Sequence, residues 1–477
     1  MSTCPTIIWF REDFRLADNA ALSAAARDGA PVLCITILEP EPQQGAAHDW
    51  WRDGAIRALD AALQEKGGRL HVLSGKAEDL VPALAKACNA SAVHWNRRYD
   101  PTGRAIDTAI NTQLKSTGTE AHSFSGTLLH EPWTIRTQAD KPFQVFTPFW
   151  RAARKLGDPR PPLPAPDTLK FASFPKTDQF HSLPPEEFNL LPTSPDWAAG
   201  FRETWEPGEK AAHERLALFV EDTLRGYSEE RDYPAAEACS RLSPYLRFGH
   251  VTPAQLWHAA MQADASAQNK DKFLAELGWR EFAWSILFEQ ANVATRSLRP
   301  EFDALPWRID PKGLKAWQSG RTGYPLVDAG MRELWHTGWM HNRIRMVVAS
   351  FLVKHLLIDW REGERWFVDT LVDHDPASNP MNWQWNAGTG VDAAPFFRIM
   401  NPILQSEKFD AEGEYIRRWV PELQRVPASM IHAPWAADQE TLKACGVVLG
   451  RNYPHPIIEH KLARERALSV WKSFRGN

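Results

Sequence analysis

Short apolar runs alternate with helical segments over the first 130 residues, and this alternation limits the possible folds more than any other feature of the sequence. Four runs are short and apolar enough to be buried strands, at 7–10, 32–38, 70–73 and 92–95. Each is followed by a segment that we expect to be helical: an alanine-rich helix capped by Asp18, helices over 49–66 and 78–88, and a helix that ends near Gly118. This order predicts a parallel, doubly wound α/β sheet.

The α/β part carries no motif of a conventional nucleotide site. Neither the dinucleotide fingerprint G-x-G-x-x-G nor the phosphate loop G-x-x-x-x-G-K-[ST] is present. Gly75-Lys76 lacks the upstream glycine of a phosphate loop and therefore indicates a turn.

The amino-acid composition of the chain changes after the α/β part. Ten prolines lie between positions 159 and 195 without a periodic apolar pattern, which is typical of a long connector. From Trp205 onward the apolar residues follow helical spacing. We therefore expect three segments: an α/β domain over 1–130, an interdomain linker over 131–204 and an all-helical domain over 205–477.

Charge and cysteine content limit where the protein works. The net charge of −4 means that any binding of nucleic acid must rest on a local basic face. Five scattered cysteines show neither metal spacing nor a disulfide framework, which suits a reducing cytoplasm. The apolar run at 6–10 is too short for a signal peptide, and no run approaches the roughly 18 residues of a membrane span.

The stretch 339–397 is the part of the chain richest in candidate functional residues. It opens as a helix, in which Asn342, Arg345 and Met346 share one face. Further along come two carboxylates, an amide and two indoles, at Asp373, Asp375, Asn379, Trp383 and Trp385. Taken alone, these residues suit a structural core equally well, because a buried Arg345 needs a carboxylate partner in any case.

The order and spacing of these residues resemble the flavin domain of the DNA photolyase/cryptochrome family. The shared pattern is TGW-hydrophobic-HNR-x-R-M, then LIDWREGE, then D-x-D-x(3)-N-x(3)-WQW and DAAP-aromatic-FR-x-x-NP. The segment WFREDFRLADN at 9–19 is similar to the family's amino-terminal signature. The resemblance extends over nearly the whole chain.

This resemblance implies FAD, bound noncovalently in a U shape inside the helical domain. Hydroxyls, backbone amides and an arginine would hold its phosphates and ribose, at Tyr227, Cys239, Ser240, Arg241, Leu242, Ser243 and Arg280. Arg345 and Asp373 would pair beside the isoalloxazine, Asp375 would bond its edge, and Asn379 would face N5. The pocket would also include Phe273, Glu276, Trp339 and Asn342. Cys239 replaces a frequent hydroxyl residue, and Phe273 a tryptophan of some members.

Three tryptophans match the family's photoreduction chain, Trp383, Trp360 and Trp307. A single tryptophan is more often a core residue, but the complete set favours electron transfer from the surface to a flavin.

The resemblance also implies a substrate. Members that repair cyclobutane pyrimidine dimers surround the lesion with residues that correspond to Glu276, Asn342, Met346, Trp279 and Trp385. Members that repair the (6-4) photoproduct carry histidines at the positions of Asn342 and Met346, which disfavours that lesion. Glu276, Trp279, Arg280 and Ala283 share a face of the helix expected over 271–288, although a surface ion pair of Glu276 with Arg280 is an alternative.

Partners and a second chromophore follow from the same resemblance. Arg231, Arg343, Arg398 and Lys408 are candidates for DNA phosphates, with solvated surface charge as the alternative for Arg398 and Lys408. An antenna chromophore is common in the amino-terminal domain. One folate pattern has Asn-Glu after the fourth strand, where this chain reads YDPTG at 99–103. Methenyltetrahydrofolate bound differently is our first choice, and a deazaflavin is the second.

The sequence therefore predicts a photolyase that repairs cyclobutane pyrimidine dimers in UV-damaged DNA, acting as a monomer with FAD and no metal. A cryptochrome, which signals blue light without repair, is the alternative. Asn379 and the lack of a long tail before Asn477 argue against it. An ordinary flavoprotein oxidoreductase should carry a nicotinamide fingerprint, and none is visible.

Overall fold

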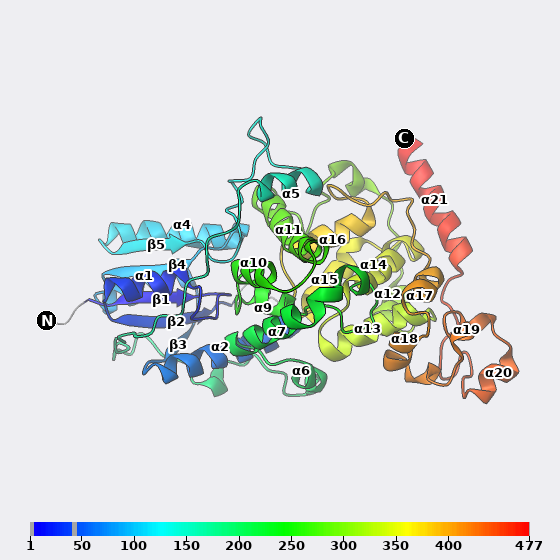
Figure 1. Ribbon diagram of the computed structural model, residues 1–477, viewed down its shortest axis with the longest axis horizontal. Helices are drawn as coiled ribbons and strands as arrows, with labels where there is room; N and C mark the ends of the chain where they lie inside the picture. Colours follow the sequence, from blue (N-terminus) through cyan, green and yellow to red (C-terminus); the bar gives the residue numbers. More distant parts are fainter. Residues whose placement is uncertain (1–3, 41–44, 477) are drawn as a thin grey trace. The chain divides into compact units, whose positions relative to one another are not determined.

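The computed structural model describes residues 4–40 and 45–476, with side chains up to residue 474 (Figure 1). The chain forms two compact units, and neither is one continuous stretch. Unit 1 consists of residues 1–198, 205–225 and 240–291. Unit 2 consists of residues 199–204, 226–239 and 292–477. The sequence predicted domain boundaries at 130 and 204 instead, and these boundaries stay a prediction.

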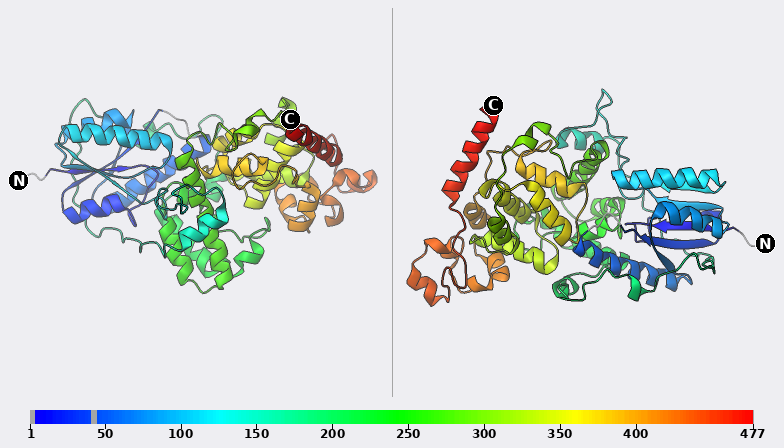
Figure 2. Two further views of the ribbon diagram at one scale, coloured as in Figure 1. Left: turned by 90° about the horizontal axis from the view of Figure 1, so that it is seen from above. Right: turned by 180° about the vertical axis from the view of Figure 1, so that it is seen from behind.

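Unit 1 contains a five-stranded parallel sheet in the order β3-β2-β1-β4-β5. Figure 2 shows helices on both of its faces, which confirms the predicted doubly wound arrangement. The strands are β1 (Thr6–Phe10), β2 (Val32–Leu38), β3 (Leu70–Ser74), β4 (Ala92–Asn96) and β5 (Glu120–Phe124). The helices that connect them are α1 (Ala20–Asp28), α2 (Ala46–Glu65), α3 (Ala77–Ala87) and α4 (Pro101–Ser116).

The central strands are buried on both faces, as their continuous apolar sequences require. Every residue of β1, β2 and β4 is buried, and Ile7, Trp9, Ile35 and Trp95 lie in one apolar core. The fifth strand was not predicted. Its sequence EAHSF lies at the edge of the sheet and is only partly buried, so it lacks the apolar run by which the other strands were found.

The predicted cap of the first helix was wrong by one residue. Asn19 is the N-cap of α1, and its side chain accepts a hydrogen bond from the Leu22 amide at 3.1 Å. Asp18 has a positive φ of 51°, and its carboxylate accepts from Arg160 at 2.5 Å and from the Thr252 hydroxyl at 2.6 Å. These two long-range bonds hold the Asp18 side chain away from the helix end.

The rest of unit 1 is a proline-rich segment followed by helices. The stretch 156–198 has little regular structure, as its prolines indicate, although helices α5 and α6 fall inside the predicted linker over 131–204. The elements in unit 1 are α5 (Phe146–Arg154), η1 (Pro185–Glu187), α7 (Glu209–Glu221), α9 (Ser243–Arg247), α10 (Pro253–Gln262) and α11 (Ala267–Glu289), and η2 (Thr223–Gly226) ends at the border of the unit. Ser266 caps α11, which is longer than predicted.

Unit 2 is helical, as expected for the carboxy-terminal part. Its core includes the buried side chains of Trp317, Phe351, Trp360, Trp383 and Tyr415. Its main helices are α13 (Pro325–Thr337), α14 (Asn342–Ser350), the π-helix η4 (Phe351–His355), α15 (Trp360–Thr370) and α16 (Ser378–Ala387). The others are α6 (Ala199–Thr204), α8 (Tyr227–Glu230), η3 (Pro300–Ala304), α12 (Pro311–Gln318), α17 (Pro402–Phe409), α18 (Glu414–Trp419), η5 (Pro421–Leu423), α19 (Ala428–Ile431), η6 (Pro434–Ala436), α20 (Gln439–Ala444) and α21 (His460–Gly476).

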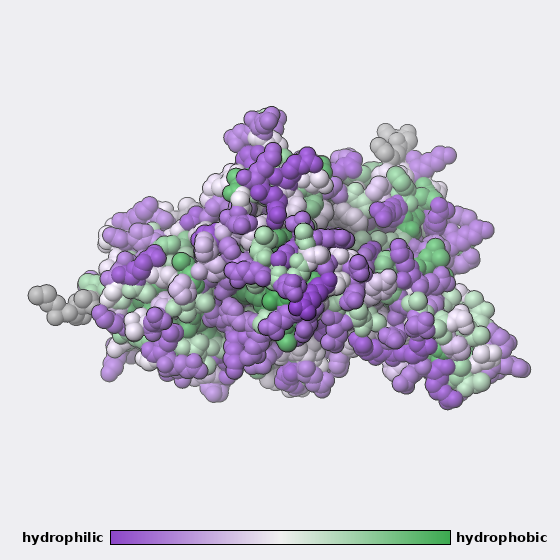
Figure 3. Space-filling model, viewed as in Figure 1, coloured by the Kyte–Doolittle hydropathy of each residue, from purple (hydrophilic) through white to green (hydrophobic). Residues whose placement is uncertain are grey.

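Among residues 4–40 and 45–476, no helix is both long enough and apolar enough to cross a membrane. Hydrophilic residues cover most of the face drawn in Figure 3, with small apolar areas scattered among them.

Candidate functional site

Helix α14 carries four predicted site residues, and a buried histidine fixes its start. His341 is the N-cap: its Nδ1 accepts from the Arg343 amide at 3.1 Å, and its Nε2 donates to the Arg231 carbonyl at 2.8 Å. Burial lowers the pKa of His341 to about 4, so the ring is neutral near pH 7. The helix therefore begins two residues later than Met340, and Asn342 stands exposed at its first position.

The predicted pair of Arg345 and Asp373 is present. Arg345 Nη2 lies 2.8 Å from Asp373 Oδ2, and Arg345 Nε donates to the Met340 carbonyl at 2.7 Å. The Asp373 side chain is only 3% exposed, so the ion pair acts in a medium that screens it weakly.

Hydrogen bonds hold the carboxylate of Asp375 and the amide of Asn379. Asp375 Oδ1 accepts from the amides of Ala377 and Ser378 at 3.0 and 2.7 Å, at the start of α16. Asn379 Nδ2 donates to Glu364 Oε1 at 3.1 Å and to the Glu364 carbonyl at 3.3 Å. Burial raises the pKa of Glu364 to about 7. Glu364 ends the LIDWREGE pattern, yet its contact with Asn379 could not be read from the sequence.

Two of the three tryptophans predicted to form an electron relay lie in the core of unit 2. Trp360 and Trp383 are buried, whereas Trp307 is partly exposed and packs beside the cluster of Leu305, Leu357 and Phe396. Trp383 packs against Phe367, with ring centroids 5.0 Å apart. Trp307 is thus the one of the three that solvent reaches, and the relay itself stays a prediction.

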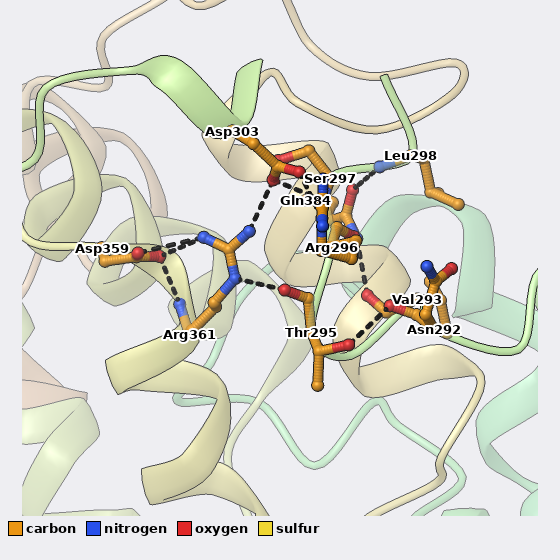
Figure 4. Close-up of polar contacts among 10 residues, drawn as sticks. All are labelled: Asn292, Val293, Thr295, Arg296, Ser297, Leu298, Asp303, Asp359, Arg361 and Gln384. Atoms are coloured by element: carbon orange, nitrogen blue, oxygen red, sulfur yellow. Dashed lines mark hydrogen bonds and ion pairs between the residues drawn. The ribbon is translucent and has the colours of Figure 1, made fainter. Parts of the chain in front are cut away.

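A polar network fixes the WQW turn of α16 (Figure 4). Gln384 is fully buried; its Nε2 donates to the carbonyls of Val293 and Arg296 at 2.7 and 3.0 Å, and its Oε1 accepts from the Leu298 amide at 2.7 Å. Arg361 of α15 also binds this part of the chain: it donates to the Thr295 carbonyl and to the Asp303 carboxylate. Gln384 lies between Trp383 and Trp385, so the network anchors the α16 backbone beside both tryptophans to residues 293–298. The sequence analysis did not identify this role of Gln384.

The predicted residues of unit 1 lie along α11 and at the start of α9. Trp279 stacks on Phe146, with ring centroids 3.8 Å apart and planes 9° from parallel. Arg280 Nη1 donates to the Thr127 carbonyl at 2.8 Å and lies 3.6 Å from Glu281 Oε1. Phe273 packs on a phenylalanine of α7, and Glu276 is half-buried. The segment 240–243 turns through Arg241, whose φ of 52° is left-handed.

The predicted DNA-contacting residues, all in unit 2, differ in exposure. Arg398 and Lys408 are exposed. Arg343 is partly buried, lies 2.5 Å from Asp232 and stacks over the Phe409 ring at 4.4 Å. Arg231 is buried and lies over the Tyr227 ring, and its carbonyl accepts from the Cys239 thiol at 3.7 Å. Arg398 and Lys408 therefore offer their charges to a ligand most readily.

The predicted site residues divide between the two units. Ser240, Arg241, Leu242, Ser243, Phe273, Glu276, Trp279 and Arg280 belong to unit 1, and all the others to unit 2. Within unit 2 the structure joins Arg345 to Asp373, and it places Arg343 and Lys408 around Phe409.

Both parts of the sequence match known proteins. Residues 6–167 match the family described as "DNA photolyase", and residues 273–473 match "FAD binding domain of DNA photolyase". A deoxyribodipyrimidine photo-lyase of Agrobacterium fabrum is 48% identical over 100% of this chain and 99% of its own length. Cryptochrome-1 of Arabidopsis thaliana is 37% identical over 98% of this chain and 70% of its own length. The crystal structure of a bacterial class III photolyase from Agrobacterium tumefaciens matches with a TM-score of 0.97 at 48% identity, over 100% of this chain and 99% of that one.

Proposed function

Because the chain belongs to the DNA photolyase/cryptochrome family, we propose that it is a deoxyribodipyrimidine photo-lyase, which repairs cyclobutane pyrimidine dimers in DNA with light. The observation that carries this function is the end-to-end match, at 48% identity, to a protein of that name. The cryptochrome match is more distant and leaves 30% of the cryptochrome's length unmatched, so signalling without repair is the second candidate.

The residues of unit 2 fit FAD. Arg345 and Asp373 offer a fixed ion pair to the polar edge of a flavin, and Asn379 has its amide nitrogen bonded to Glu364, which leaves its oxygen as an acceptor. Bound and reduced, FAD would supply one electron to the lesion under blue or near-UV light. The electron would return once both bonds between the two pyrimidines had broken, so the reaction would have no net redox change.

In this proposal the chain binds the lesion outside the DNA stack. Photolyases are among the standard examples of enzymes that flip their target bases out of the duplex. By the family resemblance, Trp279 and Trp385 would each offer an apolar surface to the lesion, and Asn342 and Met346 would contact it. Trp279 already stacks on Phe146, so its indole plane is fixed before the dimer enters. Glu276 would hydrogen-bond a pyrimidine carbonyl and stabilise the negative charge that develops there.

The indoles of Trp307, Trp360 and Trp383 would pass an electron inward when the flavin must be reduced. Their order of burial supports this role, because Trp307 is the partly exposed one.

We also propose a second chromophore in the α/β part, with methenyltetrahydrofolate as first choice and a deazaflavin as alternative. In doubly wound sheets, ligands bind outside the carboxyl ends of the strands, where the strand order reverses. Here that point lies between β1 and β4. Absorbance of the extracted chromophores would distinguish the two compounds.

A cytoplasmic monomer is the remaining part of the proposal. No disulfide joins the five cysteines, all of which lie among the described residues, and this suits a reducing compartment. Light scattering of the purified protein would test the monomer.

Dimer repair is the test of the proposed function. Purified, photoreduced protein is mixed with UV-irradiated oligothymidylate, and absorbance recovery near 260 nm, roughly where stacked bases absorb, is followed under blue light and in the dark. We expect recovery in light only. No recovery from protein with reduced FAD bound would overturn the proposal and favour signalling or the (6-4) lesion.

The matched variant is Glu276→Ala. Loss of one hydrogen bond to the developing charge should lower the repair rate at least about tenfold. Glu289→Ala, at the far end of the same helix, is the control and should repair normally.

A further inference from the structure

Lys354 is a buried lysine that no step of the proposed mechanism uses. It lies in the π-helix η4 of unit 2 and is only 2% exposed. Among the described residues its side chain makes one hydrogen bond, in which Nζ donates to the Arg398 carbonyl at 2.9 Å. Burial without a carboxylate partner, together with the charge of Arg398, lowers the pKa of Lys354 to about 7. An apolar side chain would fill this place at lower cost, so the bond to the Arg398 carbonyl is what the lysine contributes.

The accepting carbonyl belongs to the loop 388–401, which joins α16 to α17. Inside this loop, Phe396 is buried beside Leu305 and Leu357, whereas the next two residues, Phe397 and Arg398, are exposed. The bond from Lys354 therefore holds the backbone of a residue whose own side chain faces solvent. It leaves the guanidinium of that residue available to a ligand.

A second bond holds the same loop from the same helix. The Met400 amide donates to Ser350 Oγ at 3.4 Å. Ser350 is the last residue of α14, and η4 continues that helix without a break. Ser350 and Lys354 are four residues apart, so they lie on one side of the helix, one turn after the other. The helix whose first turn carries Asn342 and Arg343 thus fixes the loop with its last two turns.

We propose that Lys354 is a positioning residue for DNA binding, which fixes the backbone of Arg398 so that its guanidinium is in place for a phosphate beside the lesion. This inference rests on the proposed function, because it takes the contact between Arg398 and DNA from it. Lys354 is buried and does not itself touch DNA.

The advantage of such a bond is entropic. A loop that is ordered before DNA arrives loses less conformational freedom on binding, so more of the energy of the phosphate contact appears as affinity. The bond does not require the lysine to be charged, because an amine and an ammonium group both donate.

The test is the binding of a duplex that contains one cyclobutane dimer, measured in the dark, where no repair occurs, at several salt concentrations. Lys354→Met removes the donor and keeps a side chain of similar length. It should weaken binding at least about threefold and lower the slope of log K against log salt by up to about 0.9, the value of one phosphate contact.

A double-variant cycle separates this role from a general loss of structure. Arg398→Gln should weaken binding at least as much as Lys354→Met does. In the Arg398→Gln background, Lys354→Met should have little further effect, because both changes remove the same contact. If Lys354→Met does not fold, Lys354→Gln replaces it throughout, since its amide is one atom shorter and ends before the carbonyl.

Tyr324→Phe is the matched control. Tyr324 is also 2% exposed in unit 2, and its hydroxyl donates to the Ile458 carbonyl at 2.8 Å, so its loss should lower stability but leave DNA binding unchanged. Wild-type affinity in the Lys354 variant or in Arg398→Gln would overturn the inference. So would a Lys354 effect that stays undiminished in the Arg398→Gln background. Repair by the wild-type protein under light tests the proposed function separately.

Discussion

Arg345 and Asp373 show how much a single buried charge matters. Replacing Arg345 by methionine leaves the Asp373 carboxylate buried without the guanidinium, which should lower the free energy of unfolding by about 3 kcal/mol. The double variant Arg345→Met, Asp373→Asn should lose less than the single one, because no charge is left behind. Urea unfolding of the apoprotein measures both. Equal losses in the single and double variants would contradict this account.

At the scale of residues, the sequence showed which residues are candidates for the site better than it showed which residues they contact. The resemblance predicted that Arg345 pairs with Asp373, and the structure contains this ion pair. The Asn379–Glu364 contact and the bonds of Gln384 join positions 15 and about 90 residues apart. No local periodicity encodes such distances, so these bonds required the structure.

Among the elements, α15 and α16 pack so closely that a methyl group would not fit between them. A Cβ on Gly363 would lie 2.1 Å from the Trp383 ring. Gly363→Ala should therefore displace Trp383, destabilise the protein by about 1–3 kcal/mol and slow photoreduction of the flavin. Thermal unfolding and flash photolysis measure the two effects. Arg365→Ala, exposed on the same helix, is the control; if Gly363→Ala behaves like it, the packing argument fails.

Strands were predictable from the sequence where they are buried, because a buried strand needs an apolar sequence. Strands β1, β2 and β4 are buried throughout and were found, whereas the edge strand β5 is polar and was missed. Helix starts shifted where a long-range bond decided the cap, as Arg231 does for His341 and Arg160 for Asp18. Propensity carries no information about these partners.

For the whole molecule, four buried histidines predict sensitivity to acid. Burial lowers the pKa to about 4 for His48, His250 and His341, and to about 3 for His355. The unfolded chain takes up protons near pH 6.5 while the folded one does not, so stability should fall as the pH drops from 6.5 toward 4. The loss should be on the order of 1 kcal/mol or more per histidine.

Urea unfolding at pH 7.5, 6.0 and 5.0 measures that loss. His341→Asn keeps a helix cap without a titrating ring and should show a shallower decline. Equal stability at all three pH values would contradict the assignment of neutral, buried rings.

Because the net charge of the whole chain is −4, DNA binding must rest on a local basic face. If Arg398 and Lys408 neutralise phosphates, each change to glutamine should reduce the slope of log K against log salt by about 0.9. Titrations of damaged duplex at several salt concentrations measure the slope. Lys86→Gln, exposed on α3, should not change it, and an unchanged slope in the other two variants would remove them from the interface.

The interrupted course of the chain through its two units has an evolutionary consequence. Each unit takes segments from three stretches of sequence, and residues 226–239 reach unit 2 from between two stretches of unit 1. A fragment that begins at 292 would lack Arg231 and Asp232, the partners of His341 and Arg343. Neither unit can therefore be exchanged by gene fusion as a single exon-like module, and recombination between relatives should preserve function only when it spares this segment.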